Sequence, residues 1–270
     1  MDVSVVVVGD EILSGYVQDA NTHFIATRAT HHGHRVTRAV VVADDPDQIA
    51  REVSQALASH ASLVFVCGGL GPTHDDRTME GVAAALGVRL EVCAPLAARI
   101  EEALSHAGAA GFSDDAFGAE GLRKMALAPA GARLLHCSVG VIPAVECDAD
   151  EAVVIVLPGP PRELQLVFTE AVEPARLQGT GESLWREEIT HPFPESTLAS
   201  VLTDLQAQYP STAIGSYPQH DHTLIRVAGP TDEATAVAEA VRHHLAVLHS
   251  SDEAKRFLAF LDDRRRERRG

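Results

Sequence analysis

The sequence predicts an α/β protein: a three-layer α/β/α domain with a mostly parallel sheet, followed by a small α+β domain. Three observations lead to this fold class. Apolar runs of β-branched residues, such as VSVVVV at 3–8, are typical of strands buried on both faces. Helical patterns alternate with these runs through the first half of the chain. In the last third the order changes to strand, helix, strand, strand, helix.

The first half of the chain supplies the parallel strands. A helix is predicted from about Asn21, and RVTRAVVVA at 35–43 is the second strand. Asp45 is a typical N-cap followed by proline, so a helix begins there. LVFVC at 63–67 is the third strand, and a fourth strand–helix repeat follows it. This alternation predicts parallel strands that are joined by right-handed crossovers.

The second half of the chain is predicted to complete the sheet and then to form a separate unit. VGVIPAVEC at 139–147 and EAVVIVL at 151–157 are separated by DAD, which indicates an antiparallel hairpin. The glycine-rich segment LQGTGES at 177–183 is the predicted linker. The predicted domains are therefore 1–178, a small α+β domain at 179–250, and an amphipathic helix with a basic tail at 251–270.

Composition narrows the class of protein. The chain has 270 residues, of which 46% are hydrophobic, so it can build a sizeable core. Its formal net charge of -16 argues against a nucleic-acid partner. No apolar run reaches ~18 residues and no basic leader opens the chain, so we expect a cytoplasmic protein without a membrane partner. The cysteines lack C-x-x-C spacing and are expected to be free thiols: Cys67, Cys93, Cys137 and Cys147.

Three loops are predicted to follow parallel strands: GDEILSG at 9–15, GGLGPTHDD at 68–76 and LPGPPRE at 157–163. Ligands bind open parallel sheets beyond the carboxyl ends of the strands, so these loops are expected to form one site. Each loop combines glycine or proline with acidic residues. The acids are Asp10 and Glu11 in the first loop, Asp75 and Asp76 in the second, and Glu163 in the third.

The combination of glycine and acid indicates a particular chemistry. Backbone N–H groups and a helix N-terminus can hold phosphate oxygens. Carboxylates beside a phosphate become favourable if a divalent cation such as Mg²⁺ lies between them. They can also accept hydrogen bonds from ligand hydroxyls or ring N–H groups. Simpler interpretations stay open: the glycines form only a tight turn, or Asp75 and Asp76 lie in the first turn of the next helix and stabilise its dipole.

The same loops resemble a known family. GDEILSGYVQDANTHF at 9–24, GGLGPTHDDRT at 68–78 and LPGPPREL at 157–164 are similar to the N-terminal domain of the CinA (competence/damage-inducible protein A) family. That domain resembles the MoaB/MogA molybdopterin-binding fold. The resemblance implies a pocket for a pterin- or nucleotide-like pyrophosphate and, in some CinA-type members, metal-dependent hydrolysis of ADP-ribose.

The resemblance also covers the rest of the chain. The unit after Gly179 resembles the family's second small domain. The nicotinamide mononucleotide deamidase domain of full-length CinA proteins is expected to be absent. One loop departs from the family: the usual N-x-x-G-x-A-P-G appears here as CSVGVIPA, with Cys137 in place of asparagine.

The predicted site combines the loops with the resemblance. The predicted metal ligands are Asp10, Glu11, Asp75 and Asp76. The predicted catalytic residues are Asp75, Asp76 and Lys124, the last because LRKMA matches the family's N-R-K-Q-A-like stretch. The predicted substrate-binding residues are Gly9, Asn21, Gly68, Gly69, Gly71, Thr73, Gly140, Pro158, Gly159 and Glu163.

Three functions stay open at this point. The first is a metal-dependent pyrophosphatase that acts slowly on ADP-ribose or a related nucleotide, with Mg²⁺ or another divalent cation as cofactor. The second is a molybdopterin- or nucleotide-binding protein without hydrolysis. The third is a scaffold that associates through the small domain. We expect a homo-oligomer with a small-molecule nucleotide or pterin ligand.

Overall fold

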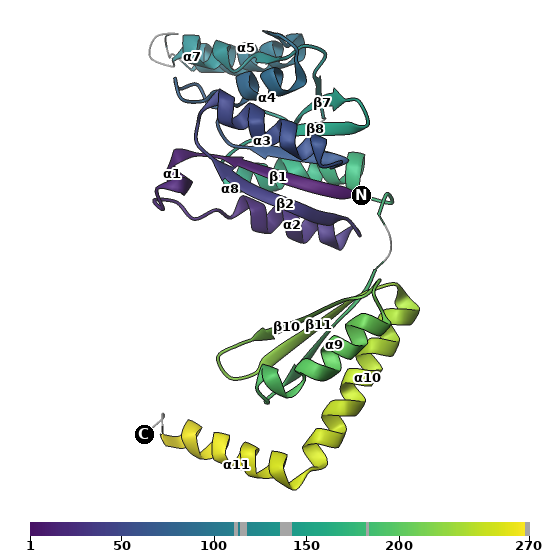
Figure 1. The fold of residues 1–270 in the computed structure, drawn as a ribbon. Helices are drawn as coiled ribbons and strands as arrows, with labels where there is room; N and C mark the ends of the chain where they lie inside the picture. Colours follow the sequence, from purple (N-terminus) through teal and green to yellow (C-terminus); the bar gives the residue numbers. More distant parts are fainter. Residues whose placement is uncertain (111–112, 114–117, 136–141, 182–183, 268–270) are drawn as a thin grey trace. The chain divides into compact units, whose positions relative to one another are not determined.

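The computed structural model describes residues 1–110, 113, 118–135, 142–181 and 184–267. The chain forms two compact units, residues 1–182 and 183–270 (Figure 1). The elements of the first unit include seven helices: α1 (Asp10–Leu13), α2 (Asn21–His31), α3 (Pro46–Ala58), α4 (Thr78–Leu86), α5 (Ala94–Ala109), α7 (Ala119–Lys124) and α8 (Pro161–Val167). The π-helix η1 (Phe168–Leu177) continues α8.

The strands of the first unit form two sheets. They are β1 (Asp2–Val8), β2 (Arg35–Val42), β3 (Leu63–Cys67), β4 (Leu90–Val92), β5 (Leu127–Pro129), β6 (Arg133–Leu134), β7 (Val145–Ala149) and β8 (Ala152–Leu157). The main sheet has the order β2-β1-β3-β8-β7-β6. Strands β2, β1, β3 and β8 are parallel, whereas β7 runs antiparallel to both of its neighbours. The predicted parallel sheet and its terminal hairpin are confirmed.

Helices cover both faces of this sheet. Helices α3 and α4 lie on one side of the strands and α2 lies on the other (Figure 1). Side chains of β1 alternate between the two layers: Val3, Val5 and Val7 pack in the cluster of α2 and α8, and Val6 and Val8 pack in the cluster of α3. Every one of these valines is buried, which explains why the strand is apolar without alternation. The predicted three-layer architecture is therefore confirmed.

One predicted repeat does not extend the parallel sheet. The fourth strand of the alternating pattern is β4, which pairs antiparallel with β5 in a separate two-stranded sheet. β4 has three residues, and Glu91 and Val92 are exposed. A strand this short and this exposed cannot be sandwiched between two helical layers, as the strands of a parallel sheet are. The prediction of four equivalent repeats is wrong at this point.

Two buried glutamates hold η1 against the rest of the first unit. Glu173, within η1, accepts hydrogen bonds from the guanidinium of Arg28 on α2. Glu146, on β7, accepts hydrogen bonds from Arg176 of η1 and from Arg133 of β6. Both carboxylates are only 2% exposed. Since buried charges are stable only when paired, these contacts fix the position of η1 relative to both α2 and the sheet.

The second unit is a three-stranded antiparallel sheet of order β10-β11-β9 with helices packed on it. Its elements are β9 (Trp185–His191), η2 (Glu195–Thr197), α9 (Ala199–Gln208), β10 (Ala213–Pro218), β11 (Thr223–Gly229), α10 (Thr231–Ser250) and α11 (Asp252–Glu267). This order confirms the predicted small α+β domain. Within the described residues, neither unit contains a helix that combines the length and the apolar composition needed to cross a bilayer.

The described cysteines are all free thiols. Cys67 and Cys147 are buried, and Cys93 is partly buried. Burial raises the pKa of the Cys147 thiol to about 12. At neutral pH the thiol is therefore protonated and packs as a small apolar group. Cys137 lies outside the described residues.

We predict that Glu146→Gln destabilises the first unit and weakens its response to acid. Burial alone would raise the pKa of Glu146, but the hydrogen bonds from Arg176 and Arg133 outweigh it and hold the pKa below the ordinary value of 4.5. This stabilisation is present above the unfolded-state pKa and is lost as pH falls through the folded-state pKa. Both arginines are partly exposed and Arg133 keeps Asp148, so the loss of the charged partner should cost roughly 1–3 kcal/mol near neutral pH. Urea unfolding at several pH values measures both effects.

The control for this prediction is Glu91→Gln. Glu91 and Arg89 form an exposed pair with 3.8 Å between Nε and Oε2. Such pairs contribute less than ~1 kcal/mol, so this variant should unfold like the wild type. Equal stabilities of the Glu146→Gln variant and the wild type near neutral pH would contradict the role given to the buried pair.

Candidate functional site

Three loops meet at Gly68, the first residue after β3. Strands β1, β3 and β8 are neighbours in the sheet, so the loops that follow them are adjacent. Gly68 has φ +103°, and a Cβ at this position would lie 2.1 Å from the carbonyl oxygen of Val8, at the end of β1. A Cβ on Gly159, after β8, would lie 3.1 Å from the Cα of Gly68. Only glycine permits this approach of three backbones.

Thr78 fixes the loop after β3 to the start of α4. Its buried hydroxyl donates to the carbonyl oxygen of Gly68 at 2.8 Å, and its N–H donates to the carbonyl oxygen of Gly69 at 3.2 Å. A Cβ on Gly69, which has φ +59°, would lie 2.4 Å from the Thr78 hydroxyl. The glycines are therefore needed for close contacts as well as for the turn.

The structure corrects the position of the two aspartates of this loop. The interpretation of Asp75 and Asp76 as first-turn residues is wrong, because α4 begins at Thr78 with Arg77 as its N-cap. The Asp76 carboxylate instead accepts hydrogen bonds from the N–H of Thr73, at 2.9 Å, and from the Thr73 hydroxyl. These bonds close a turn of the loop before the helix starts. The acids consequently belong to the loop and not to the helix dipole.

Asn21 joins the start of α2 to the third loop. The Asp19 carboxylate accepts the N–H groups of Asn21 and Thr22, at 2.9 and 3.1 Å, and so determines where α2 begins. This places Asn21, which is 5% exposed, at the edge of the sheet. Its side-chain amide donates to the carbonyl oxygen of Gly159 at 2.8 Å. The loop after β8 is thereby held against α2.

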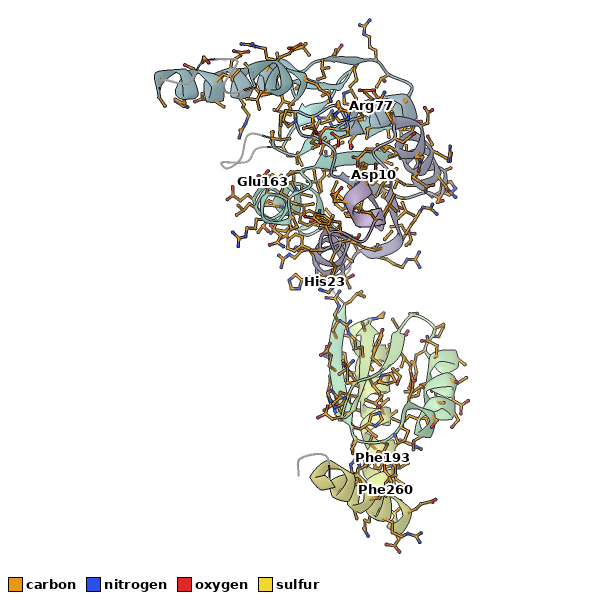
Figure 2. All side chains as sticks on the ribbon, turned by 90° about the vertical axis from the view of Figure 1, so that its left-hand side faces the viewer. Asp10, His23, Arg77, Glu163, Phe193 and Phe260 are labelled. Carbon is orange, nitrogen blue, oxygen red and sulfur yellow. The ribbon has the colours of Figure 1, made fainter. Side chains whose placement is uncertain are left out.

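The loops enclose a cavity of about 460 Å³ at the carboxyl edge of the sheet. Figure 2 looks onto this edge; its labels mark Asp10 on α1, Arg77 before α4 and Glu163 on α8. The described lining contains no lysine, arginine or histidine. It contains six acidic residues: Glu11, Asp19, Asp44, Asp75, Asp76 and Glu163.

Asp44 is a cavity residue that the sequence interpretation missed. It follows β2, one strand beyond the three predicted loops, and its carboxylate accepts the N–H of Asp10 at 2.9 Å. Burial raises the pKa of Asp44, and the carboxylates of Asp10, Glu11 and Asp75 raise it further against that hydrogen bond. A signal was present, since Asp44 is also an acid directly after a parallel strand. Its neighbour Asp45, the N-cap of α3, already accounts for an acidic residue at this point of the sequence.

The predicted site residues fall into three groups. The structure brings most of them together in the cavity lining: Glu11, Asn21, Gly68, Gly69, Gly71, Asp75, Asp76, Pro158, Gly159 and Glu163. Four others lie beside the lining and hold it: Gly9 against the Glu11 carboxylate, Asp10 on Asp44, Thr73 on Asp76, and Lys124 through its Nζ on the Thr73 carbonyl oxygen. Gly140 lies outside the described residues, as does Cys137.

The carboxylates do not form a metal centre by themselves. Among the described residues, no group of three His, Cys, Asp or Glu side chains could hold a metal ion. Mg²⁺ is usually bound by one or two carboxylates together with substrate phosphates and water. The donors present therefore fit a cation shared with a phosphorylated ligand and do not fit a resident metal held by protein groups alone.

Both units of the chain match a protein-family model. Residues 4–178 match the family model described as a probable molybdopterin binding domain. This chain is a member of that family. The first unit is thus the CinA-type, MoaB/MogA-like domain that its loops resemble. Residues 183–251 match the family model of the FAD synthase middle domain.

Individual relatives support the same assignment. A Pyrococcus horikoshii protein is 36% identical, over 88% of this chain and 92% of its own length. A CinA-like protein of Mycolicibacterium paratuberculosis is 37% identical over 76% of this chain but only 50% of its own length. The crystal structure of CinA from Thermoplasma acidophilum, described as of unknown function, is 33% identical with a TM-score of 0.57. That comparison covers 66% of this chain and 99% of the other.

We predict that Gly68→Ala destabilises the first unit far more than Gly87→Ala. Both glycines have positive φ, +103° and +66°; Gly87 lies in the left-handed α region, where a side chain costs roughly 1–2 kcal/mol, and Gly68 lies outside it, where the strain is larger. A Cβ at Gly87 would meet nothing within 4 Å, whereas one at Gly68 would meet the Val8 carbonyl oxygen. The difference between the two free energies of unfolding, measured in urea, reports the loop contact together with the greater backbone strain at Gly68. Equal losses would show that the loops can separate without cost.

We predict that Asp44→Asn stabilises the protein at neutral pH. Because the folded-state pKa of Asp44 is raised, ionising it destabilises the folded state. The neutral amide removes this penalty and can still accept the Asp10 N–H. The stabilisation should be complete above the raised pKa and should vanish once pH falls below the unfolded-state value of 3.8. Melting temperatures measured across this range, with Asp47→Asn as an exposed control, test the prediction.

Proposed function

We propose that the first unit binds a phosphorylated pterin or nucleotide in the cavity at the carboxyl edge of its sheet. The observation that carries the proposal is the meeting of the loops after β1, β3 and β8 around Gly68, with six carboxylates in the lining. A volume of about 460 Å³ suits a heterocycle with a sugar or short side chain.

The two kinds of lining group match the two parts of such a ligand. Pterins and nucleosides present ring N–H groups, amines and hydroxyls, and carboxylates accept hydrogen bonds from all of these. Glycines such as Gly69 and Gly71 have no side chain, so their backbone N–H groups can approach phosphate oxygens closely. The name of the family, a probable molybdopterin binding domain, supports the pterin. The match of the second unit to an FAD synthase domain supports the nucleotide.

A binding panel tests this proposal. AMP, ADP, ADP-ribose and a pterin phosphate would each be titrated calorimetrically into the full chain, in Mg²⁺ and again in EDTA. Binding of at least one of them, weakened by Asp44→Arg but not by Asp47→Arg, supports the proposal. An arginine at position 44 would fill part of the cavity. An arginine at position 47 would lie on the exposed face of α3. Failure of the wild type to bind any of the four would overturn it.

Hydrolysis of ADP-ribose is the second candidate, and one observation favours it. Burial is the largest cause of the raised pKa of Asp44, and the carboxylates of Asp10, Glu11 and Asp75 raise it further, so negative charges gather around Asp44. A divalent cation that arrives with the pyrophosphate would remove this repulsion and would neutralise the phosphate charge. The protein's part would be to hold the ligand: Asp75 beside the cation, and Asp76 and Lys124 fixing the loop through Thr73.

We predict that Asp75→Asn abolishes any Mg²⁺-dependent release of AMP from ADP-ribose while leaving the fold intact. The Asp75 side chain is 60% exposed, so its loss should change stability by less than ~0.5 kcal/mol. Asp76→Asn should lower both turnover and stability, because its carboxylate closes the turn with Thr73. Product chromatography and thermal melts separate the two effects. Full turnover in the Asp75→Asn variant would exclude the carboxylate from catalysis.

Self-association stays a prediction. Size-exclusion chromatography with light scattering on the full chain tests whether it forms a homo-oligomer.

A further inference from the structure

In the part of the chain that the structure describes, two basic side chains line a small pocket beside the cavity. A second, smaller pocket of about 30 Å³ lies against the loop after β3 and shares Gly69, Gly71, Asp76 and Met125 with the large cavity. Its lining includes Arg77 and Lys124, whereas the described lining of the large cavity includes no basic residue. The acids of the small pocket are Asp76 and Glu80, so its formal charges balance. The two neighbouring spaces therefore differ sharply in charge.

Both basic side chains are held in place. Arg77 donates from Nε and Nη2 to one carboxylate oxygen of Glu80, at 3.0 and 2.6 Å, which leaves Nη1 available to a ligand. Lys124 donates from Nζ to the carbonyl oxygen of Thr73, in the loop that carries Asp75 and Asp76. Arg77 stands at the start of α4, where the helix dipole also favours an anion. The motif G-G-L-G-P-T-x-D-D-x-T leaves this position open, and here it is arginine.

The size of the small pocket limits what can enter it. A volume of about 30 Å³ admits one or two water-sized groups, and a pterin or purine ring is too large for it. One or two oxygens of a terminal phosphate have the right size for it and the charge that Arg77 and Lys124 attract. The ring, with its N–H donors, is left to the acidic cavity. Charge and size thus favour the same orientation.

We propose that Arg77 and Lys124 bind the terminal phosphate of the ligand, so that the ligand lies with its phosphate toward α4 and α7 and its ring among the carboxylates. This inference rests on the proposed binding function and adds to it a direction and a specificity residue, Arg77. It also implies that the protein prefers a monophosphorylated end to an uncharged one, because a dephosphorylated ligand offers no anion to Nη1 of Arg77 or to Nζ of Lys124.

A matched pair of ligands tests the orientation. AMP and adenosine differ only in the phosphate, and both would be titrated calorimetrically into the wild type and into Arg77→Ala, in EDTA and in Mg²⁺. Arg77→Ala should weaken AMP about tenfold, the value of one charge-assisted hydrogen bond. Adenosine should bind both proteins equally. Arg51→Ala removes an exposed arginine of α3 and should change neither affinity.

A second variant separates phosphate binding from a structural role of the Arg77–Glu80 pair. Glu80→Gln breaks the ion pair but keeps the Arg77 cation and removes a nearby negative charge. AMP should then bind as tightly as in the wild type or more tightly. If the pair only stabilises α4, both variants should weaken AMP and adenosine alike, and the inference is overturned.

The remaining outcomes are also decisive. AMP binding that is unchanged in Arg77→Ala, with or without Mg²⁺, overturns the orientation and leaves the proposed binding function standing. A wild type that binds neither AMP and adenosine nor any other ligand of the binding panel overturns both. A loss confined to AMP in Arg77→Ala, together with retained or stronger AMP binding in Glu80→Gln, supports the inference.

Discussion

The close approach of three backbones at Gly68 is the constraint on which the candidate site depends. The parallel strands β1, β3 and β8 end side by side, but adjacent strand ends do not by themselves make a cavity. Contacts of Gly68 with the Val8 carbonyl oxygen and with Gly159 bring the following loops together. Thr78 and Asn21 then hold those loops by hydrogen bonds to carbonyl oxygens. The contacts at Gly68 are between backbones, and the side chains of Thr78 and Asn21 that hold the loops are uncharged, so the meeting of the three loops does not rely on the carboxylates of the lining.

This separation allows the interior to carry charges that oppose folding. Asp44 is the clearest case, since burial and three neighbouring carboxylates disfavour its ionised form. Such a charge is tolerated because the surrounding backbone contacts and the buried pairs of Glu146 and Glu173 stabilise the unit elsewhere. The cluster of carboxylates destabilises the free protein. Any ligand that brings positive charge or hydrogen-bond donors to the cluster therefore stabilises the folded state. The unfavourable ionisation of Asp44 beside three other carboxylates is therefore an argument that the cavity binds a ligand.

The sequence predicted the parts of this arrangement that follow from local pattern. Runs of valine such as 3–8 indicate strands buried on both faces, and the carboxyl-edge rule then places three separate loops in one site. It could not predict what depends on contacts between distant segments. The start of α4 is set by the bond between Thr78 and the Gly68 carbonyl oxygen, which local pattern does not show, so a place for Asp75 and Asp76 in its first turn stayed open. The departure of β4 from the main sheet depends on its pairing with β5, far along the chain.

The distribution of charge limits the ligand more closely than the shape of the cavity does. Six carboxylates in one cavity would repel the phosphates that the glycine loops are suited to hold, so an anionic ligand needs compensation. A divalent cation would supply it inside the cavity, whereas Arg77 and Lys124 would supply it at the side. The two routes differ in kind. Compensation by fixed side chains favours one direction of the ligand and weakens with ionic strength, whereas compensation by a metal depends on the cation's concentration. Compensation by Arg77 and Lys124 alone would make this edge of the sheet a site of recognition, whereas compensation by a divalent cation would also activate the bound phosphate.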